Sequence, residues 1–255
     1  MKINIIQWNI SNSSQIQKIS AYLETMIFGN AIVCLQEVLE SSKEKVVNAL
    51  RPSDYRFSLD MRYPGKFDGR NRKFGLLTMS FGSNINDCKL IERSVFPERT
   101  LVTETDIEET KVKVLNFHSL TGVGYKQGKS SNFASIAEYL NDNELDFFCC
   151  DANEPKADSF DVNQLEFWNN GDKGKFPSLI FGKNRVHDLR DSLHSVKDQF
   201  ENLPVSYKTG KTFRRYDMIF HSNNWEVESL EYKYNDSINA TSDHALVLGE
   251  YKKCK

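Results

Sequence analysis

Hydrophobic residues in this chain follow two patterns that predict strands, and polar residues come directly after several of these strands. Residues 2–8 alternate between apolar and polar side chains. Residues 31–35 and 146–150 are mostly continuous apolar runs, which are typical of strands buried on both faces. Helical spacing of apolar residues predicts helices over 13–27 and 129–140, and a further helix follows Ser42 and ends near Leu50.

The middle of the chain changes to short strands separated by glycine and asparagine, which favours antiparallel pairing. These strands are expected at 55–60, 74–80, 88–93, 101–107 and 111–117. Residues 155–205 are irregular, and strands resume at 212–221, 225–234 and 244–251. Such an order predicts an α/β fold in which two packed, mixed or mostly antiparallel sheets are flanked by helices. We expect a single domain over residues 1–255.

The composition is that of an ordinary globular protein, with 39% hydrophobic and 27% charged residues. A formal net charge of −2 is not that of a generally basic nucleic-acid-binding protein. The five cysteines are odd in number and lack the spacing of a zinc site, so neither a disulfide framework nor zinc is expected. No apolar run is long enough to span a membrane. The first residues lead straight into a strand, so we expect no signal peptide and a cytoplasmic location.

Six short polar motifs lie at the ends of apolar, strand-like runs. They are Trp8-Asn9-Ile10, Gln36-Glu37-Val38, Phe117-His118-Ser119, Asp151-Ala152-Asn153, Tyr216-Asp217-Met218 and Ser242-Asp243-His244. A hard cation such as Mg²⁺ prefers oxygen ligands, which Glu37 and the amide oxygen of Asn9 would supply. The alternative for these two residues is structural, with an asparagine that closes a turn and a glutamate that caps the next helix. Each motif alone is weak, but the ordered set indicates metal-assisted chemistry on a phosphate ester.

Asp151 and Asn153 form a second candidate group, in which the carboxylate would orient an attacking water and the amide would contact a phosphate oxygen. An Asx-turn that ends a strand is the alternative for this pair. His118 and His244 each follow a strand, and imidazole can stabilise charge on a phosphoryl group near neutral pH. Asp217 is available to fix the tautomer of a histidine.

Clustered basic and aromatic residues near these motifs are candidates for binding a polyanionic substrate. They are Arg70, Arg72, Tyr125, Lys126 and Arg215. Arg99 could reach a phosphate bidentately, or it could pair with Glu98 or Glu104. The alternative for the clusters is ordinary solvated surface charge.

The six motifs in this order resemble the endonuclease/exonuclease/phosphatase superfamily, which includes pancreatic-type deoxyribonuclease, and the match runs from Trp8 to His244. This resemblance implies a four-layer α/β sandwich with its site at one edge of the two sheets. It implies metal-side roles for Asn9 and Glu37. Catalytic positions of the family are matched by His118, Asp151, Asn153, Asp217 and the Asp243-His244 pair. The chain departs from the family at Cys150 and Ala152, where glycine and an aromatic residue are usual.

We therefore expect a Mg²⁺- or Mn²⁺-dependent phosphodiester hydrolase, most simply a nuclease acting on DNA or RNA, with Glu37, Asn9 and Asp243 around the metal. A phosphatase acting on a small or lipid-derived phosphate, such as a phosphoinositide, is the enzymatic alternative, because specificity lies in the loops. A non-catalytic nucleic-acid- or protein-binding module on the same fold is the alternative from another class. All six motifs are filled, which argues against it.

Overall fold

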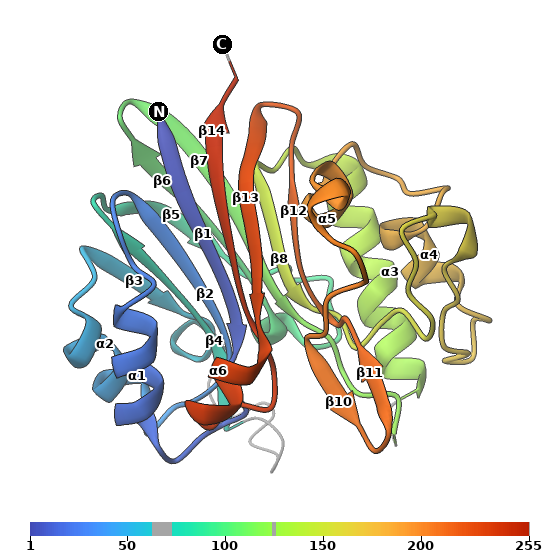
Figure 1. Cartoon of the computed structure of the whole chain (residues 1–255), viewed down its shortest axis with the longest axis horizontal. Helices are drawn as coiled ribbons and strands as arrows, with labels where there is room; N and C mark the ends of the chain where they lie inside the picture. The colour runs from blue at the N-terminus through green and yellow to red at the C-terminus, as the bar shows by residue number, and fades with distance from the viewer. Residues whose placement is uncertain (63–72, 124–125, 255) are drawn as a thin grey trace.

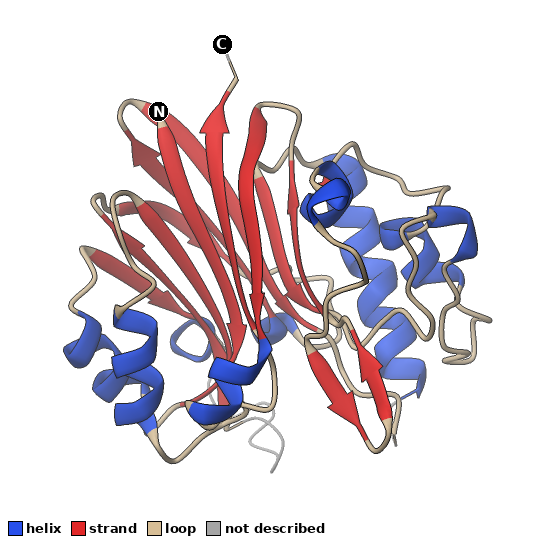
Figure 2. Cartoon of the chain, viewed as in Figure 1, coloured by secondary structure: helices blue, strands red, loops and turns tan. Residues whose placement is uncertain are grey.

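Two six-stranded β-sheets dominate the structure, a computed structural model that describes residues 1–62, 73–123 and 126–254 (Figures 1 and 2). In spatial order, the first sheet consists of β13 (Trp225–Lys233), β14 (Leu246–Lys253), β1 (Lys2–Asn9), β2 (Ala31–Leu39), β4 (Phe74–Phe81) and β3 (Asp54–Phe57). The second consists of β5 (Ile85–Lys89), β6 (Thr100–Ile107), β7 (Thr110–His118), β8 (Phe147–Asp151), β12 (Asp217–His221) and β9 (Arg190–Asp191). The pairs β1–β2 and β7–β8 are parallel, and the other ladders are antiparallel.

Successive side chains of a strand point to opposite faces of its sheet, so the hydrophobic residues form three cores. One core lies between the two sheets and one lies on the outer face of each sheet under helices, which gives four layers. Ile3 and Ile5 of β1 face the second sheet, whereas Ile6 and Trp8 face outward toward helix α1 (Ile16–Glu24). The outer face of the second sheet packs in the same way against α3 (Lys126–Asp142) and α4 (Lys175–Phe181). Each large apolar side chain buried here contributes about 1.5–3 kcal/mol. The predicted α/β sandwich of two packed sheets flanked by helices is confirmed.

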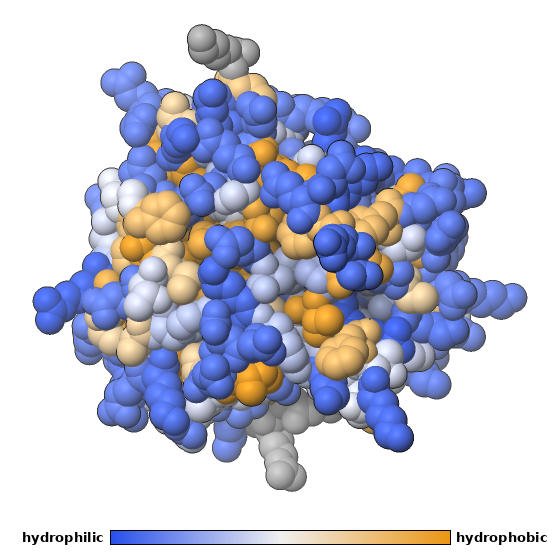
Figure 3. Space-filling model, viewed as in Figure 1, coloured by the Kyte–Doolittle hydropathy of each residue, from blue (hydrophilic) through white to orange (hydrophobic). Residues whose placement is uncertain are grey.

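Helix α2 (Lys43–Leu50) packs with α1 on the outer face of the first sheet, where its Val46 belongs to the same core. Further elements are helices α5 (Ser192–Ser195) and α6 (Tyr234–Asn239), and the hairpin of β10 (Tyr207–Thr209) and β11 (Thr212–Arg214). The hairpin and α6 lie at the end opposite the two termini (Figure 1). The face drawn in Figure 3 is hydrophilic over most of its area, with separate hydrophobic areas between. In the described part of the chain, no helix has both the length and the apolar character needed to cross a membrane.

Three predicted strands differ from those observed, and the one expected over 55–60 ends at Phe57, where the 3-10 helix Ser58–Met61 begins. The strand expected over 212–221 is divided between β11 and β12, which belong to different sheets. The break occurs because the Ser206 hydroxyl, rather than a neighbouring strand, accepts hydrogen bonds from the backbone amides of Tyr216 and Asp217. The strand expected over 88–93 ends at Lys89, since the Ile91 amide donates to the Thr100 side chain in a turn.

Candidate active site

The inward-facing positions of five strands change from apolar to polar toward one end of the sandwich. On β1, Ile3 and Ile5 belong to the core between the sheets, and the next positions on the same face are Gln7 and Asn9. The same change gives Gln36 on β2, Asn116 and His118 on β7, Asp151 on β8 and Asp217 on β12. Sheet periodicity therefore gathers these polar side chains at one edge of the inter-sheet space.

Strand register places three of the candidate residues side by side. His118 pairs with Asp151 in the parallel β7–β8 ladder, and Asp151 pairs with Asp217 in the antiparallel β8–β12 ladder. From the facing sheet, the Asn9 amide nitrogen donates to Asp151 Oδ2 over 2.8 Å. The two sheets thus contribute to one buried cluster.

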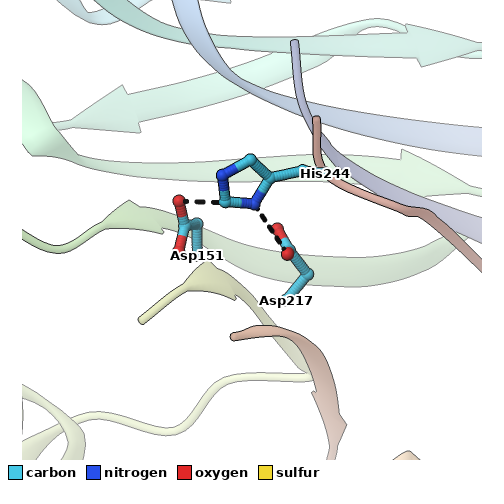
Figure 4. A group of neighbouring side chains, drawn as sticks. All are labelled: Asp151, Asp217 and His244. Carbon is cyan, nitrogen blue, oxygen red and sulfur yellow. Dashed lines mark hydrogen bonds and ion pairs between the residues drawn. The ribbon is translucent and has the colours of Figure 1, made fainter. Parts of the chain in front are cut away.

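The imidazole of His244 lies between the carboxylates of Asp151 and Asp217 (Figure 4). Its Nδ1 donates to Asp217 Oδ2 over 2.8 Å and lies 3.9 Å from Asp151 Oδ2. Burial acts to lower the pKa of His244, but Asp217 and then Asp151 outweigh it and raise the pKa to about 10. His244 is therefore a buried imidazolium at neutral pH, with Tyr207 stacked on its ring at a centroid distance of 4.5 Å.

Asp151 is the carboxyl group best suited to exchange a proton near neutral pH. Burial raises its pKa to about 7, against the opposing influence of the His244 cation. Its Oδ1 accepts a hydrogen bond from the Asn153 amide over 3.2 Å, and Asn153 has a positive φ of 50°. Asp151 and Asn153 therefore form a tight turn at the strand end, rather than an extended pair.

His118 is held as a neutral imidazole by Arg99. Arg99 Nη1 lies 2.9 Å from His118 Nδ1, and a guanidinium can only donate, so Nδ1 accepts and Nε2 carries the proton. Burial, followed by the charge of Arg99, lowers the pKa of His118 well below its usual value. Nε2 lies 3.5 Å from both Glu37 Oε1 and Asp151 Oδ2, so its proton points into the cluster.

Glu37 has the exposure and the oxygen chemistry of a ligand for a hard cation. It lies in an irregularity of the β2–β4 ladder with a φ of +54°, which removes its side chain from the regular alternation of β2. Its side chain is 21% exposed, and its Oε2 accepts from Asn12 Nδ2 over 3.3 Å. Asn9 Oδ1 accepts from the Ser11 amide, and Asp243 is exposed with Oδ1 4.0 Å from His244 Nε2.

Asp151, Asp217 and His244 also place ligand-type atoms within 4.8 Å of one another. His244 Nδ1 is already committed to Asp217, however, and Asp217 Oδ1 accepts from Gln7 Nε2 over 3.0 Å. Asp217 and His244 therefore satisfy each other through a hydrogen bond, and Asp151 is satisfied by Asn9 and the backbone amide of Asn153. Glu37 and Asp243 are the more exposed oxygen donors, and their chemistry therefore suits Mg²⁺ or Mn²⁺ better than that of this buried triad.

Of the residues expected to bind substrate, the structure brings Arg99 into the site through His118. Lys126 is exposed at the first residue of α3. Arg70, Arg72 and Tyr125 lie outside the described residues. The expectation for Arg215 is corrected, because its guanidinium is buried and donates to Asp158 at 2.6 Å and to Asp191 at 2.7 Å.

Several residues of the site were not expected from the sequence. Gln7 holds Asp217, and its strand position on the inward face, in line with Ile3 and Ile5, is the signal that could have identified it. Lys129 and Glu154 form a buried ion pair of 2.8 Å beside the turn of Asn153. A lysine within an amphipathic helix gives no sequence signal of burial, because such residues are usually exposed.

Comparisons with known proteins agree with this architecture. No family model and no curated protein matches the sequence. Among solved structures, TDP2 of D. rerio with a single-stranded DNA product has a TM-score of 0.69 and 13% identity over 99% of both chains. Human Nocturnin has a TM-score of 0.64 and 14% identity, with 99% of this chain and 94% of that chain covered. An endonuclease/exonuclease/phosphatase from Beutenbergia cavernae has a TM-score of 0.64 and 15% identity, with coverage of 99% and 72%. The chain has the fold of the endonuclease/exonuclease/phosphatase superfamily.

Proposed function

We propose that this protein is a divalent-metal-dependent phosphodiester hydrolase that acts on nucleic acid. The observation that carries the proposal is the cluster of Asp151, Asp217 and His244 with His118 and Glu37 at its margin. Asp151, with a pKa near 7, can activate a water molecule, and the buried cation of His244 beside it can stabilise a phosphate that gains negative charge.

Asp151 acts as the general base in this proposal. Its pKa of about 7 lets it accept a proton from water at neutral pH, while Asn9 and the Asn153 amide fix the orientation of its carboxylate. As the water oxygen attacks phosphorus, its proton moves to an Asp151 oxygen, the phosphorus–oxygen bond of the ester breaks, and the leaving oxygen takes a proton from solvent.

His244 and His118 stabilise the charge that develops on the phosphate. His244 contributes a positive charge that Asp217 maintains, and His118 contributes an Nε2–H donor that Arg99 maintains. Asn153 adds its side-chain amide, because its backbone N–H is already bound to Asp151. Removing one such preorganised donor commonly costs about 10²–10³ in rate.

Mg²⁺ or Mn²⁺ would be held by Glu37, with Asn9 and Asp243 nearby, and when bound it supplies Lewis-acid neutralisation of phosphate charge. Oxygen donors alone make up this set, which is the chemistry that these cations prefer. Asn9 belongs to both the metal site and the general base in this proposal. Its side-chain nitrogen donates to Asp151, and its side-chain oxygen, which accepts from the Ser11 amide, is the atom proposed to face the metal.

Nucleic acid is favoured as the substrate by the side chains of the β10–β11 hairpin. On the hairpin face opposite Tyr207, Phe213 is 56% exposed, and the Lys208 ammonium lies 5.4 Å from its ring centroid. An exposed aromatic ring beside a cation suits a stacked base and its phosphate. The similarity to TDP2 in complex with single-stranded DNA supports the same choice.

The test is hydrolysis of single-stranded DNA, duplex DNA, RNA and a small phosphomonoester in the presence of Mg²⁺, Mn²⁺ or EDTA. Asp151→Asn should lower nucleic-acid hydrolysis by about 10²–10⁴-fold. Asp106→Asn is the matched control, because Asp106 is an exposed carboxylate at the other end of the second sheet.

Metal-dependent cleavage of a nucleic acid that is lost in Asp151→Asn and kept in Asp106→Asn would support the proposal. Release of phosphate from the monoester alone would replace it with a phosphatase function. Binding of nucleic acid without hydrolysis under any metal condition would indicate a binding module.

A further inference from the structure

One face of the β10–β11 hairpin links the catalytic histidine to an exposed tryptophan. Tyr207 and Arg214 are directly paired in the hairpin and therefore share a face. Tyr207 stacks on His244, and the Arg214 guanidinium lies 5.8 Å from the ring centroid of Trp168. Trp168, on the irregular segment 155–205, thus lies beside the same hairpin face as His244.

Arg214 supports the Trp168 ring, and about a third of the residue is exposed. The Arg214 guanidinium covers the ring, and Arg214 is itself held through a hydrogen bond to the Lys156 carbonyl. Trp168 nevertheless remains 36% exposed. A ring that is fixed from behind loses little freedom when a planar group stacks on its open side.

The backbone of Trp168 is tied to the turn that carries Asn153. Glu154 Oε2 accepts from the Trp168 amide over 3.0 Å, and Oε1 accepts from Asn170 Nδ2 over 3.1 Å. Lys129 Nζ donates to Glu154 Oε1 and to the Asn153 carbonyl, each over 2.8 Å. The Glu154 side chain is fully buried and that of Lys129 is 2% exposed, so the connection is rigid.

We propose that Trp168, backed by Arg214, is a stacking platform for a nucleobase next to the phosphate that is cleaved, and that the Lys129–Glu154 ion pair sets its distance from Asn153. This inference rests on the proposed function and narrows its substrate to single-stranded nucleic acid, because a base must be unstacked from its neighbour to lie on the ring. Lys129 and Glu154 are positioning residues in this scheme, and Trp168 is a substrate-binding residue.

Intrinsic fluorescence tests the platform directly. The chain has three tryptophans, and Trp8 and Trp225 are 0% and 2% exposed, so quenching by an added base reports on Trp168. Asp151→Asn protein with Mg²⁺ would be titrated with oligodeoxythymidylate, an abasic oligomer of the same length and charge, and a duplex. We expect saturable quenching by oligodeoxythymidylate, and none by the bound abasic oligomer or by the duplex.

Substitutions in the same background separate stacking from charge. Trp168→Ala should weaken oligodeoxythymidylate binding, measured by fluorescence anisotropy, by about 5- to 150-fold and leave abasic-oligomer binding unchanged. Trp168→Phe should retain most of the affinity. Phe28→Ala is the control, because Phe28 is a 48% exposed aromatic residue that follows α1, outside the site.

The outcomes distinguish failure of the stacking platform from failure of the proposed hydrolase function. Suppose that the native protein hydrolyses DNA with a metal ion. Absence of quenching by oligodeoxythymidylate, or an equal loss of affinity for oligodeoxythymidylate and the abasic oligomer in Trp168→Ala, would then overturn the platform alone. Equal quenching by the duplex would overturn the restriction to single strands. Failure of the native protein to bind or cleave any nucleic acid would overturn both.

Discussion

Asp217 and Asp151 occupy directly paired positions on β12 and β8, and both carboxylates lie beside the imidazole of His244. Two buried acids this close would repel each other if both were ionised. His244 offsets that repulsion, and its hydrogen bond to Asp217 leaves Asp151 as the acid that titrates near neutral pH. The register of one ladder thus assigns different roles to two residues of the same type.

Replacement of Asp217 tests this division of roles. In Asp217→Asn, His244 loses the largest influence that raises its pKa, so its proton should be lost at a lower pH. We expect the alkaline limit of the pH–rate profile to move down from about pH 10 toward neutrality, with a fall in turnover of about 10²–10³-fold. An unchanged alkaline limit would contradict the assignment of His244 as the cation.

Glu37→Gln should remove the principal metal ligand while leaving the shape of the strand end intact. Mn²⁺ binding, followed by electron paramagnetic resonance, should weaken by at least about tenfold, since even residues that only orient ligands are worth about 10–100-fold. Glu24→Gln, an exposed glutamate at the end of α1, is the control. Equal Mn²⁺ affinity in both variants would place the metal elsewhere.

The Lys129–Glu154 pair should contribute strongly to stability when one partner alone is removed. Lys129→Met leaves the Glu154 carboxylate buried without its cation, and breaking such a pair costs about 3–5 kcal/mol. The double variant Lys129→Met/Glu154→Gln should recover part of this loss, because the uncompensated charge is gone. Urea denaturation of the native protein, Lys129→Met, Glu154→Gln and the double variant measures the coupling, and additive effects of the two substitutions would refute it.

His187 should make the stability of the fold depend on pH below neutrality. Its Nε2 donates to the Ile180 carbonyl and its Nδ1 accepts from the Leu189 amide, so both nitrogens are satisfied by the neutral ring. Burial lowers the pKa of His187 from 6.5 to about 4. Between these values the unfolded chain binds the extra proton, so the stability from His187 is complete above about pH 6.5 and is lost as pH falls toward 4.

The loss amounts to about 3 kcal/mol. His187→Gln lacks this titration, so the difference in unfolding free energy between the native protein and the variant should shrink by that amount between pH 6.5 and pH 4. Chemical denaturation at several pH values provides the measurement. A difference that stays constant with pH would show that the pKa of His187 is not lowered in the fold.

Much of the layered fold was predictable because strand alternation and helical spacing are local properties of the sequence. The polar motifs of Asn9, His118 and Asp217 were predictable for the same reason, since each continues the inward face of a strand. Pairings between distant segments were not. Arg215 was expected at the substrate, but Asp158 and Asp191 reach it from an irregular stretch whose course no periodicity reveals. Trp168 was missed for the same reason.

The inward-facing residues of β1, β7 and β8 change from apolar to polar along each strand, and this change has a consequence for how the protein responds to heat. The backbones of Asn9, His118 and Asp151 belong to the same hydrogen-bonded ladders as the core, so exposing these residues to solvent requires the cooperative opening of both sheets. Hydrogen exchange at the catalytic end should therefore be as slow as in the core. Catalytic competence and the folded state should then disappear together in a thermal melt.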